Sequence, residues 1–170
     1  MHPAGRGVGE RLITVAMSKV IRSPRARVWR ALETPDELIR WDERRISLEA
    51  PIPDYPAPGR SARWRCWLGS LNVEHCEDPL EVVPPARLRC AVRIAAFEFE
   101  ETYTLADQAP DATRLSLRLI ANNTLPLLSG EFDRFDVRRM SAERVDQTLI
   151  QLQRWCEAPA ETTLPGLRAR

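Results

Sequence analysis

The sequence predicts an α+β fold, in which a curved antiparallel sheet of about seven strands surrounds a long C-terminal helix. Three observations predict it. A strand pattern at residues 13–21 precedes two short helix patterns that end at Trp41. Between residues 60 and 122, polar and apolar side chains alternate in several segments, as they do in half-buried strands. Residues 132–155 then carry the longest apolar pattern at helical spacing.

The two short helices are predicted from their start signals. Pro24 suits the first helical position because proline has no N–H group to satisfy, and Ser23 before it can cap the free N–H groups. This helix is expected to end near Glu33. Pro35 then begins a second short helix that reaches Trp41.

This opening block resembles that of the START / Bet v 1-like superfamily, also called the SRPBCC or polyketide cyclase and lipid-transport superfamily. The matching residues are Ser23-Pro24, Val28-Trp29, Ala31-Leu32, Thr34-Pro35 and Trp41. With the Pro84-Pro85 pair and the closing helix, the resemblance spans residues 12–157. It implies a helix-grip fold with a cavity between the sheet and the C-terminal helix, where a small apolar or aromatic molecule would bind. Function then depends on the residues that line this cavity.

Length and periodicity indicate a single domain. The chain has 170 residues, enough to bury a substantial core without disulfides or metals. Residues 1–9 and 159–170 lack periodicity and are predicted to be flexible tails around a domain at residues 10–158. The four cysteines have no CxxC spacing, so we expect reduced thiols in the core.

The charge balance and the motifs of the sequence limit which partners, location and cofactors are expected. The 25 basic and 24 acidic side chains nearly cancel, so nucleic acid is not an expected partner. The apolar run 12–17 is too short for a membrane span, and the charges before it argue against a secretory signal, so we expect a cytoplasmic protein. The composition, rich in arginine, proline and alanine, is typical of bacteria with GC-rich genomes. Nucleotide-binding and acyl-serine motifs are absent, and no cofactor is expected.

Residues 60–77 predict a β-hairpin with a definite register. Gly69-Ser70 suits a two-residue turn, and such a turn fixes the pairing of the strands. The predicted pairs are Leu68 with Leu71, Cys66 with Val73, Trp64 with His75 and Ala62 with Glu77 on one face, and Arg65 with Glu74 and Trp67 with Asn72 on the other. His75 is therefore expected on the inner face of the sheet, beside Trp64. Trp67 is expected on the outer face, where it is a candidate contact for a homodimer.

Strands at 87–94 and 97–105 alternate in the same way, so the outer arginines of one can face the outer glutamates of the next. Glu101 breaks this pattern because it points inward between Phe99 and Tyr103. A buried carboxylate needs an arginine partner or loses its charge. Arg138 in the closing helix is the candidate partner.

The cavity wall is predicted from the last strand, at 113–122, and from the apolar stripe of the closing helix. Arg138 falls in the angular sector of this stripe. The residues expected to bind a ligand are Trp64, Phe99, Tyr103, Leu117, Arg138, Ser141, Val145 and Leu149.

His75 and Glu101 are the candidate catalytic residues. An imidazole beside an aromatic wall can orient a carbonyl or phenol and shuttle a proton. The alternative for His75 is a structural, hydrogen-bonded histidine. The alternatives for Glu101 are a structural ion pair and a register shifted by one residue. No metal site is expected, because the folded region contains no second histidine.

Three functions follow as hypotheses. The favoured one is binding or transport of a small hydrophobic or aromatic ligand, such as a lipid or a polyketide, held by apolar walls and oriented by a few polar groups. The second is a polyketide cyclase/dehydratase-like enzyme that uses acid and base residues of the cavity. The third is a protein interaction module like the Hsp90-activator branch of the superfamily, which would use the outer surface.

Overall fold

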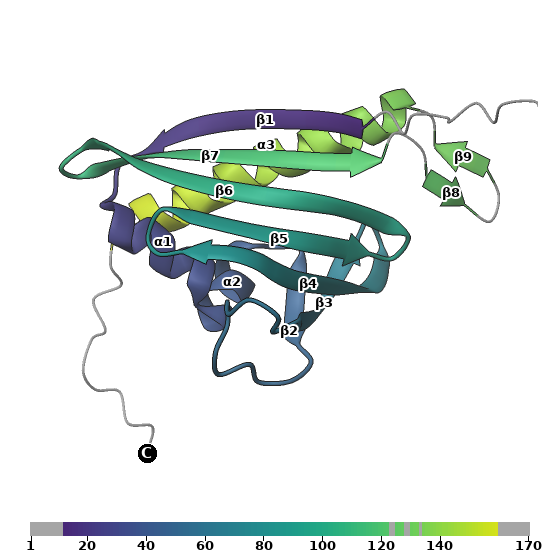
Figure 1. The fold of residues 1–170 in the computed structure, drawn as a ribbon, viewed down its shortest axis with the longest axis horizontal. Helices are drawn as coiled ribbons and strands as arrows, with labels where there is room; N and C mark the ends of the chain where they lie inside the picture. Colours follow the sequence, from purple (N-terminus) through teal and green to yellow (C-terminus); the bar gives the residue numbers. More distant parts are fainter. Residues whose placement is uncertain (1–11, 123–124, 128–129, 133, 160–170) are drawn as a thin grey trace, which may run out of the picture.

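Figure 1 shows the computed structural model of the chain, which describes residues 12–122, 125–127, 130–132 and 134–159. The strands are β1 (Leu12–Ile21), β2 (Arg45–Leu48), β3 (Ala62–Leu68), β4 (Leu71–Val83), β5 (Arg87–Ile94), β6 (Phe97–Ala109), β7 (Ala112–Asn122), β8 (Leu125–Leu127) and β9 (Gly130–Phe132). The helices are α1 (Arg25–Glu33), α2 (Pro35–Trp41) and α3 (Arg134–Glu157). The expected tails lie outside the described residues, apart from Pro159, which is exposed.

Strands β1 to β7 form one antiparallel sheet in the order β1-β7-β6-β5-β4-β3-β2. Helix α3 runs along β1 and β7 on one face of this sheet (Figure 1). The short hairpin of β8 and β9 is a separate two-stranded sheet. The predicted α+β, helix-grip architecture, with about seven strands and a long C-terminal helix, is confirmed.

The two short helices have nearly the predicted bounds. Helix α1 begins at Arg25, and Pro24 occupies the N-cap position without a side-chain cap hydrogen bond. The predicted cap by Ser23 is therefore wrong. Ser23 is instead buried, and its carbonyl oxygen accepts a hydrogen bond of 2.8 Å from Thr113 Oγ1 on β7. The sheet, rather than a cap, holds the chain where α1 starts.

The register of the hairpin formed by β3 and β4 is confirmed at each predicted pair, including Trp64 with His75. Gly69 in its turn has φ 60°, a left-handed conformation that glycine adopts without steric cost. The turn between β5 and β6 also has two residues, because Ile94 pairs with Phe97. Glu101 therefore faces inward, as predicted.

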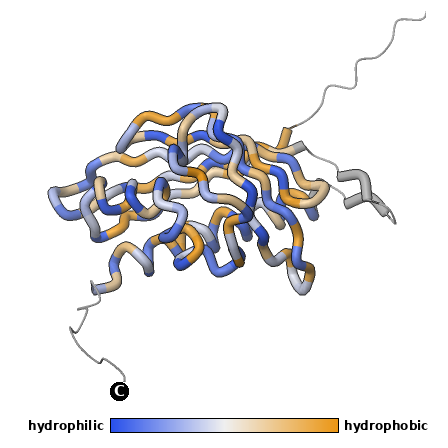
Figure 2. Tube along the Cα trace, turned by 90° about the horizontal axis from the view of Figure 1, so that it is seen from below, coloured by the Kyte–Doolittle hydropathy of each residue, from blue (hydrophilic) through white to orange (hydrophobic). Residues whose placement is uncertain are grey.

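The core lies between the sheet and α3. Figure 2 shows hydrophobic and hydrophilic positions alternating along the strands, as expected when one face of a sheet is buried. The inward residues of β7, Leu115, Leu117 and Leu119, are almost fully buried, as are Leu149 and Leu152 of α3. All four cysteines are buried and free, as expected from their spacing.

Within the described residues, no helix is long and apolar enough to cross a membrane.

Candidate functional site

A cavity of about 270 Å³ lies between the first half of α3 and the inner faces of β3 to β7. Most of its wall is apolar. The apolar side chains are Cys66, Leu68, Ile94, Phe97, Phe99, Leu119, Ala121, Val137 and Met140, with Trp67 beside them. The polar side chains are Asp42, Arg44, His75, Glu98, Ser141, Glu143, Arg144 and Gln147.

The structure brings some of the predicted catalytic and ligand-binding residues to this cavity and leaves others beneath it. His75, Phe99 and Ser141 line it. Six others are buried in the surrounding core without lining the cavity: Trp64, Glu101, Tyr103, Leu117, Val145 and Leu149. They shape the cavity by packing behind its wall.

Arg138 is the predicted residue that the structure contradicts. Its side chain is exposed, and the arginine paired with Glu101 is Arg144. Arg138 falls within the angular sector of the apolar stripe and Arg144 just beside it, so helical spacing favoured the wrong arginine. The inward carboxylate does have an arginine partner in α3, but it is Arg144 and not the predicted Arg138.

The Glu101 carboxylate is fully engaged in the interior. It is 1% exposed, and its Oε1 accepts a hydrogen bond of 2.6 Å from Arg144 Nε. Its Oε2 accepts one of 3.2 Å from Tyr103 OH. Glu101 does not line the cavity, so these contacts favour the structural ion pair over a role as acid or base toward a ligand.

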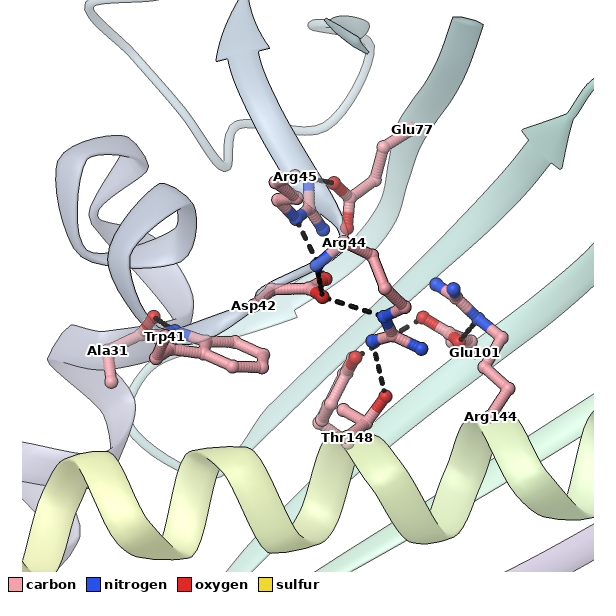
Figure 3. Close-up of polar contacts among 10 residues, drawn as sticks. Ala31, Trp41, Asp42, Arg44, Arg45, Glu77, Glu101, Arg144 and Thr148 are labelled. Atoms are coloured by element: carbon pink, nitrogen blue, oxygen red, sulfur yellow. Dashed lines mark hydrogen bonds and ion pairs between the residues drawn. The ribbon is translucent and has the colours of Figure 1, made fainter. Parts of the chain in front are cut away.

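Arg144 places a positive charge against the apolar wall. Its guanidinium lies over the Phe99 ring, with Cζ 4.9 Å from the ring centroid. Only Nε is used by Glu101; among the described residues, the terminal nitrogens have no hydrogen-bond partner. Figure 3 shows Arg144 reaching from α3 to Glu101, with Nε joined to the carboxylate. The terminal nitrogens are donors available to an oxygen atom in the cavity.

His75 supplies a second polar group to the cavity. It is 2% exposed, and its Nε2 has no hydrogen-bond partner among the described residues. Burial, together with the charges of Arg45 and Arg144, lowers the pKa of His75 well below its usual value. The imidazole is therefore neutral at neutral pH. The alternative interpretation is a structural histidine held by hydrogen bonds. Nε2 has no such bond among the described residues, which argues against it.

A buried ionic network borders the cavity where α2 leads into β2 (Figure 3). Asp42 Oδ1 accepts a hydrogen bond of 2.7 Å from Arg44 Nε, and Asp42 Oδ2 accepts one of 3.2 Å from Arg45 Nε. Arg45 Nη1 donates to Glu77 Oε2 at 3.1 Å, and its guanidinium lies over the Trp64 ring at 4.4 Å. Burial alone would raise the pKa of Asp42, but Arg44 and Arg45 outweigh burial and hold this pKa below its usual range.

Arg44 also joins this network to α3. Its Nη2 donates a hydrogen bond of 2.8 Å to Thr148 Oγ1 (Figure 3). Asp42, Arg44 and Arg45 were not predicted as site residues from the sequence, although their charges follow Trp41 directly. A charged run of this kind normally lies at the surface, and the short strand β2 that directs Arg45 inward was not predicted.

Comparison with known proteins places these features in a family context. The sequence model of the family described as "Activator of Hsp90 ATPase homolog 1-like protein" matches residues 22–156, most of the chain. No curated protein matches the sequence.

Solved structures with the same architecture include the START superfamily protein from Mycobacterium smegmatis, with a TM-score of 0.71 and 11% identity over 85% of this chain and 97% of that one. The protein TTHA0849 from Thermus thermophilus has a TM-score of 0.67 and 22% identity over 85% and 97% of the two chains. Ara h 8.0201, a Bet v 1-type protein, has a TM-score of 0.63 and 9% identity over 86% and 98%. The family match over residues 22–156, together with this shared fold, confirms the predicted START / Bet v 1-like superfamily.

Proposed function

The chain belongs to the family of Activator of Hsp90 ATPase homolog 1-like proteins, and we propose that it binds a small, mostly apolar molecule with one oxygen-bearing end in the cavity beside α3. One observation carries this proposal. The apolar wall of the cavity contains two polar groups without partners among the described residues, His75 Nε2 and the terminal nitrogens of Arg144.

The unpartnered groups favour an oxygen-bearing ligand. A buried polar atom without a hydrogen bond costs about 1–3 kcal/mol. A carbonyl oxygen can accept from Arg144, and a hydroxyl group can exchange a hydrogen bond with His75. A ligand that makes these bonds removes the cost, whereas a wholly apolar one leaves it in place.

The size of the cavity favours a ligand of one or two rings. Small-molecule sites usually enclose about 300–1,000 Å³. The volume of about 270 Å³ lies just below this range, so a compact aromatic molecule fits better than a long-chain lipid. The proposal therefore narrows the broad ligand class expected from the sequence.

Blocking the cavity tests the proposal. Ser141 is buried and lines the cavity, so Ser141→Phe should fill it and abolish binding. Arg138 lies on the same helix but is exposed, and Arg138→Phe is the matched control that should bind like the wild type. Native mass spectrometry of the purified protein, followed by thermal shifts with a panel of aromatic ketones and phenols, measures both. A wild-type protein that purifies empty and ignores the panel would overturn the proposal.

Interaction with an Hsp90-type chaperone is a second candidate function, favoured by the name of the matching family. Trp67 and Leu71 on the hairpin of β3 and β4 are 47% and 63% exposed, and they offer an apolar contact. If this candidate holds, the protein should stimulate ATP hydrolysis by such a chaperone, and Trp67→Ser should weaken the effect. The variant Leu80→Ser, at another exposed apolar position of β4, is the control.

A further inference from the structure

We propose that the cavity selects ligands whose oxygen-bearing end is uncharged, a ketone or a phenol, and rejects carboxylates of the same shape. This inference rests on the proposed function and names its ligand class. It depends on how the charges around the cavity are already paired.

Three arginines meet three carboxylates in the interior. Asp42 pairs with Arg44 and Arg45 at 2.7 and 3.2 Å, and Arg45 also pairs with Glu77 at 3.1 Å. Arg144 pairs with Glu101 at 2.6 Å. The positive and negative charges of this set therefore cancel before any ligand enters.

A ligand carboxylate would disturb this balance. Bound beside Arg144, it would share that guanidinium with Glu101, whose carboxylate is 1% exposed and so gains little from water. An ionised group without a full counter-charge is costly in a buried site. His75 cannot supply the missing cation, because burial and the nearby arginines lower its pKa.

The remaining charged side chains of the cavity wall also disfavour a ligand carboxylate. Glu98 and Glu143 line the cavity and are exposed, so both place negative charge near its outer part. A neutral oxygen avoids this repulsion. It can still accept a hydrogen bond from a terminal nitrogen of Arg144, which Glu101 holds in place through Nε.

Isosteric pairs of probes test the inference directly. Acetophenone with benzoate, and 2-acetylnaphthalene with 2-naphthoate, differ chiefly in a methyl group replaced by a charged oxygen. Isothermal titration at neutral pH should give a ketone Kd at least about tenfold lower than that of the matching carboxylate. Low and high salt should give the same order of preference, because buried charges are weakly screened.

Glu101→Gln provides the sharper test, because it removes one interior negative charge and leaves Arg144 unpaired. This variant should bind the carboxylate more tightly than the wild type does and reduce or reverse the preference for the ketone. Tyr103→Phe removes the other hydrogen bond of Glu101 without changing any charge, so it should retain the preference. Gln147→Arg is a second charge variant, for use if Glu101→Gln does not fold. It adds a cation at an exposed position of the cavity wall and should likewise strengthen carboxylate binding relative to ketone binding.

The possible results separate the inference from the proposed function. Tighter ketone binding that weakens or reverses in Glu101→Gln or Gln147→Arg supports both. Equal or tighter binding of the carboxylate by the wild type overturns the inference but leaves ligand binding itself intact. Ketone preference that persists unchanged in the charge variants also overturns it. If neither member of either pair binds, and the broader panel fails as well, the proposed function falls and the inference falls with it.

Discussion

At the scale of a single residue, the buried His75 makes the folding stability of the protein depend on pH. Its pKa is lowered by burial and by Arg45 and Arg144, from an ordinary value of 6.5, so protons bind the unfolded chain more readily than the folded one. Folding stability contributed by the neutral imidazole is fully present above about pH 7 and is lost as the pH falls below 6.5. We expect urea unfolding to show a decline of up to about 1.4 kcal/mol per pH unit as the pH falls below about 6.5.

Two features isolate this effect. Asp42 and Glu37 also have lowered pKa values, but their ordinary values are 3.8 and 4.5, so their stabilisation is lost only at more acidic pH. His75→Leu should flatten the profile in the window where histidine titrates. His2 is the other histidine of the chain, and His2→Leu is the control that should leave the profile unchanged. A decline that survives in His75→Leu would contradict the assignment.

The residue scale also shows where sequence reasoning succeeds and fails. The two-residue period of a strand predicted that His75 and Glu101 point into the core. Side chains alternate between the two faces of a sheet, so the neighbours of a residue indicate which face it lies on. Reasoning from the period of the helix failed for Arg138 and Arg144, since Arg138 falls within the apolar stripe and Arg144 just beside it. Only the position of α3 over β6 decides which guanidinium reaches the carboxylate. Arg45 could not be predicted either, because its burial depends on partners 3 and 32 residues away in the chain.

At the scale of elements, α3 has two differently held halves. Near its C-terminal end, Trp155 Nε1 donates to Glu37 Oε2 at 2.7 Å, and Glu37 also accepts from Arg27 and Arg30 of α1. Glu157 accepts a hydrogen bond of 2.8 Å from the backbone N–H of Arg22, just after β1. These contacts anchor the second half of α3 to β1, α1 and α2. The first half faces the cavity instead.

Elements differ in how far the sequence predicts them. The hairpin of β3 and β4 combines a glycine turn with alternation on both strands, so its register could be stated in advance. Strand β2 has only four residues, and its pairing shifts between Arg45 and Ser47, so no period is long enough to detect. The ionic network next to the cavity depends on this strand. The part of the site that the sequence missed is thus the part built on the shortest strand of the main sheet.

At the scale of the whole molecule, the fold could be predicted from the order of its elements, whereas the cavity could not. Its volume depends on how far the first half of α3 stands from the sheet, and that distance is set by side chains from several elements. Arg44 bridges to Thr148 from the α2–β2 connection, and Arg144 bridges to Glu101 on β6. Both bridges cross the space between the sheet and α3 (Figure 3).

This division of α3 predicts an uneven response of the molecule to a ligand. The Arg144–Glu101 pair ties residues 140–147 to the sheet, but five residues of this segment border the cavity instead of packed side chains. Their amides should therefore exchange hydrogen faster than those of residues 149–156 in the free protein. A bound ligand stabilises the closed state and should slow exchange in residues 140–147 and in the cavity-facing parts of β3 and β4. The anchored half of α3 should change little. Hydrogen–deuterium exchange with mass spectrometry, with and without 2-acetylnaphthalene, measures each segment, and Ser141→Phe is the control that should not respond. Equal protection along the free helix, or slowing confined to residues 149–156, would show that the cavity beside the first half of α3 is not where the ligand binds.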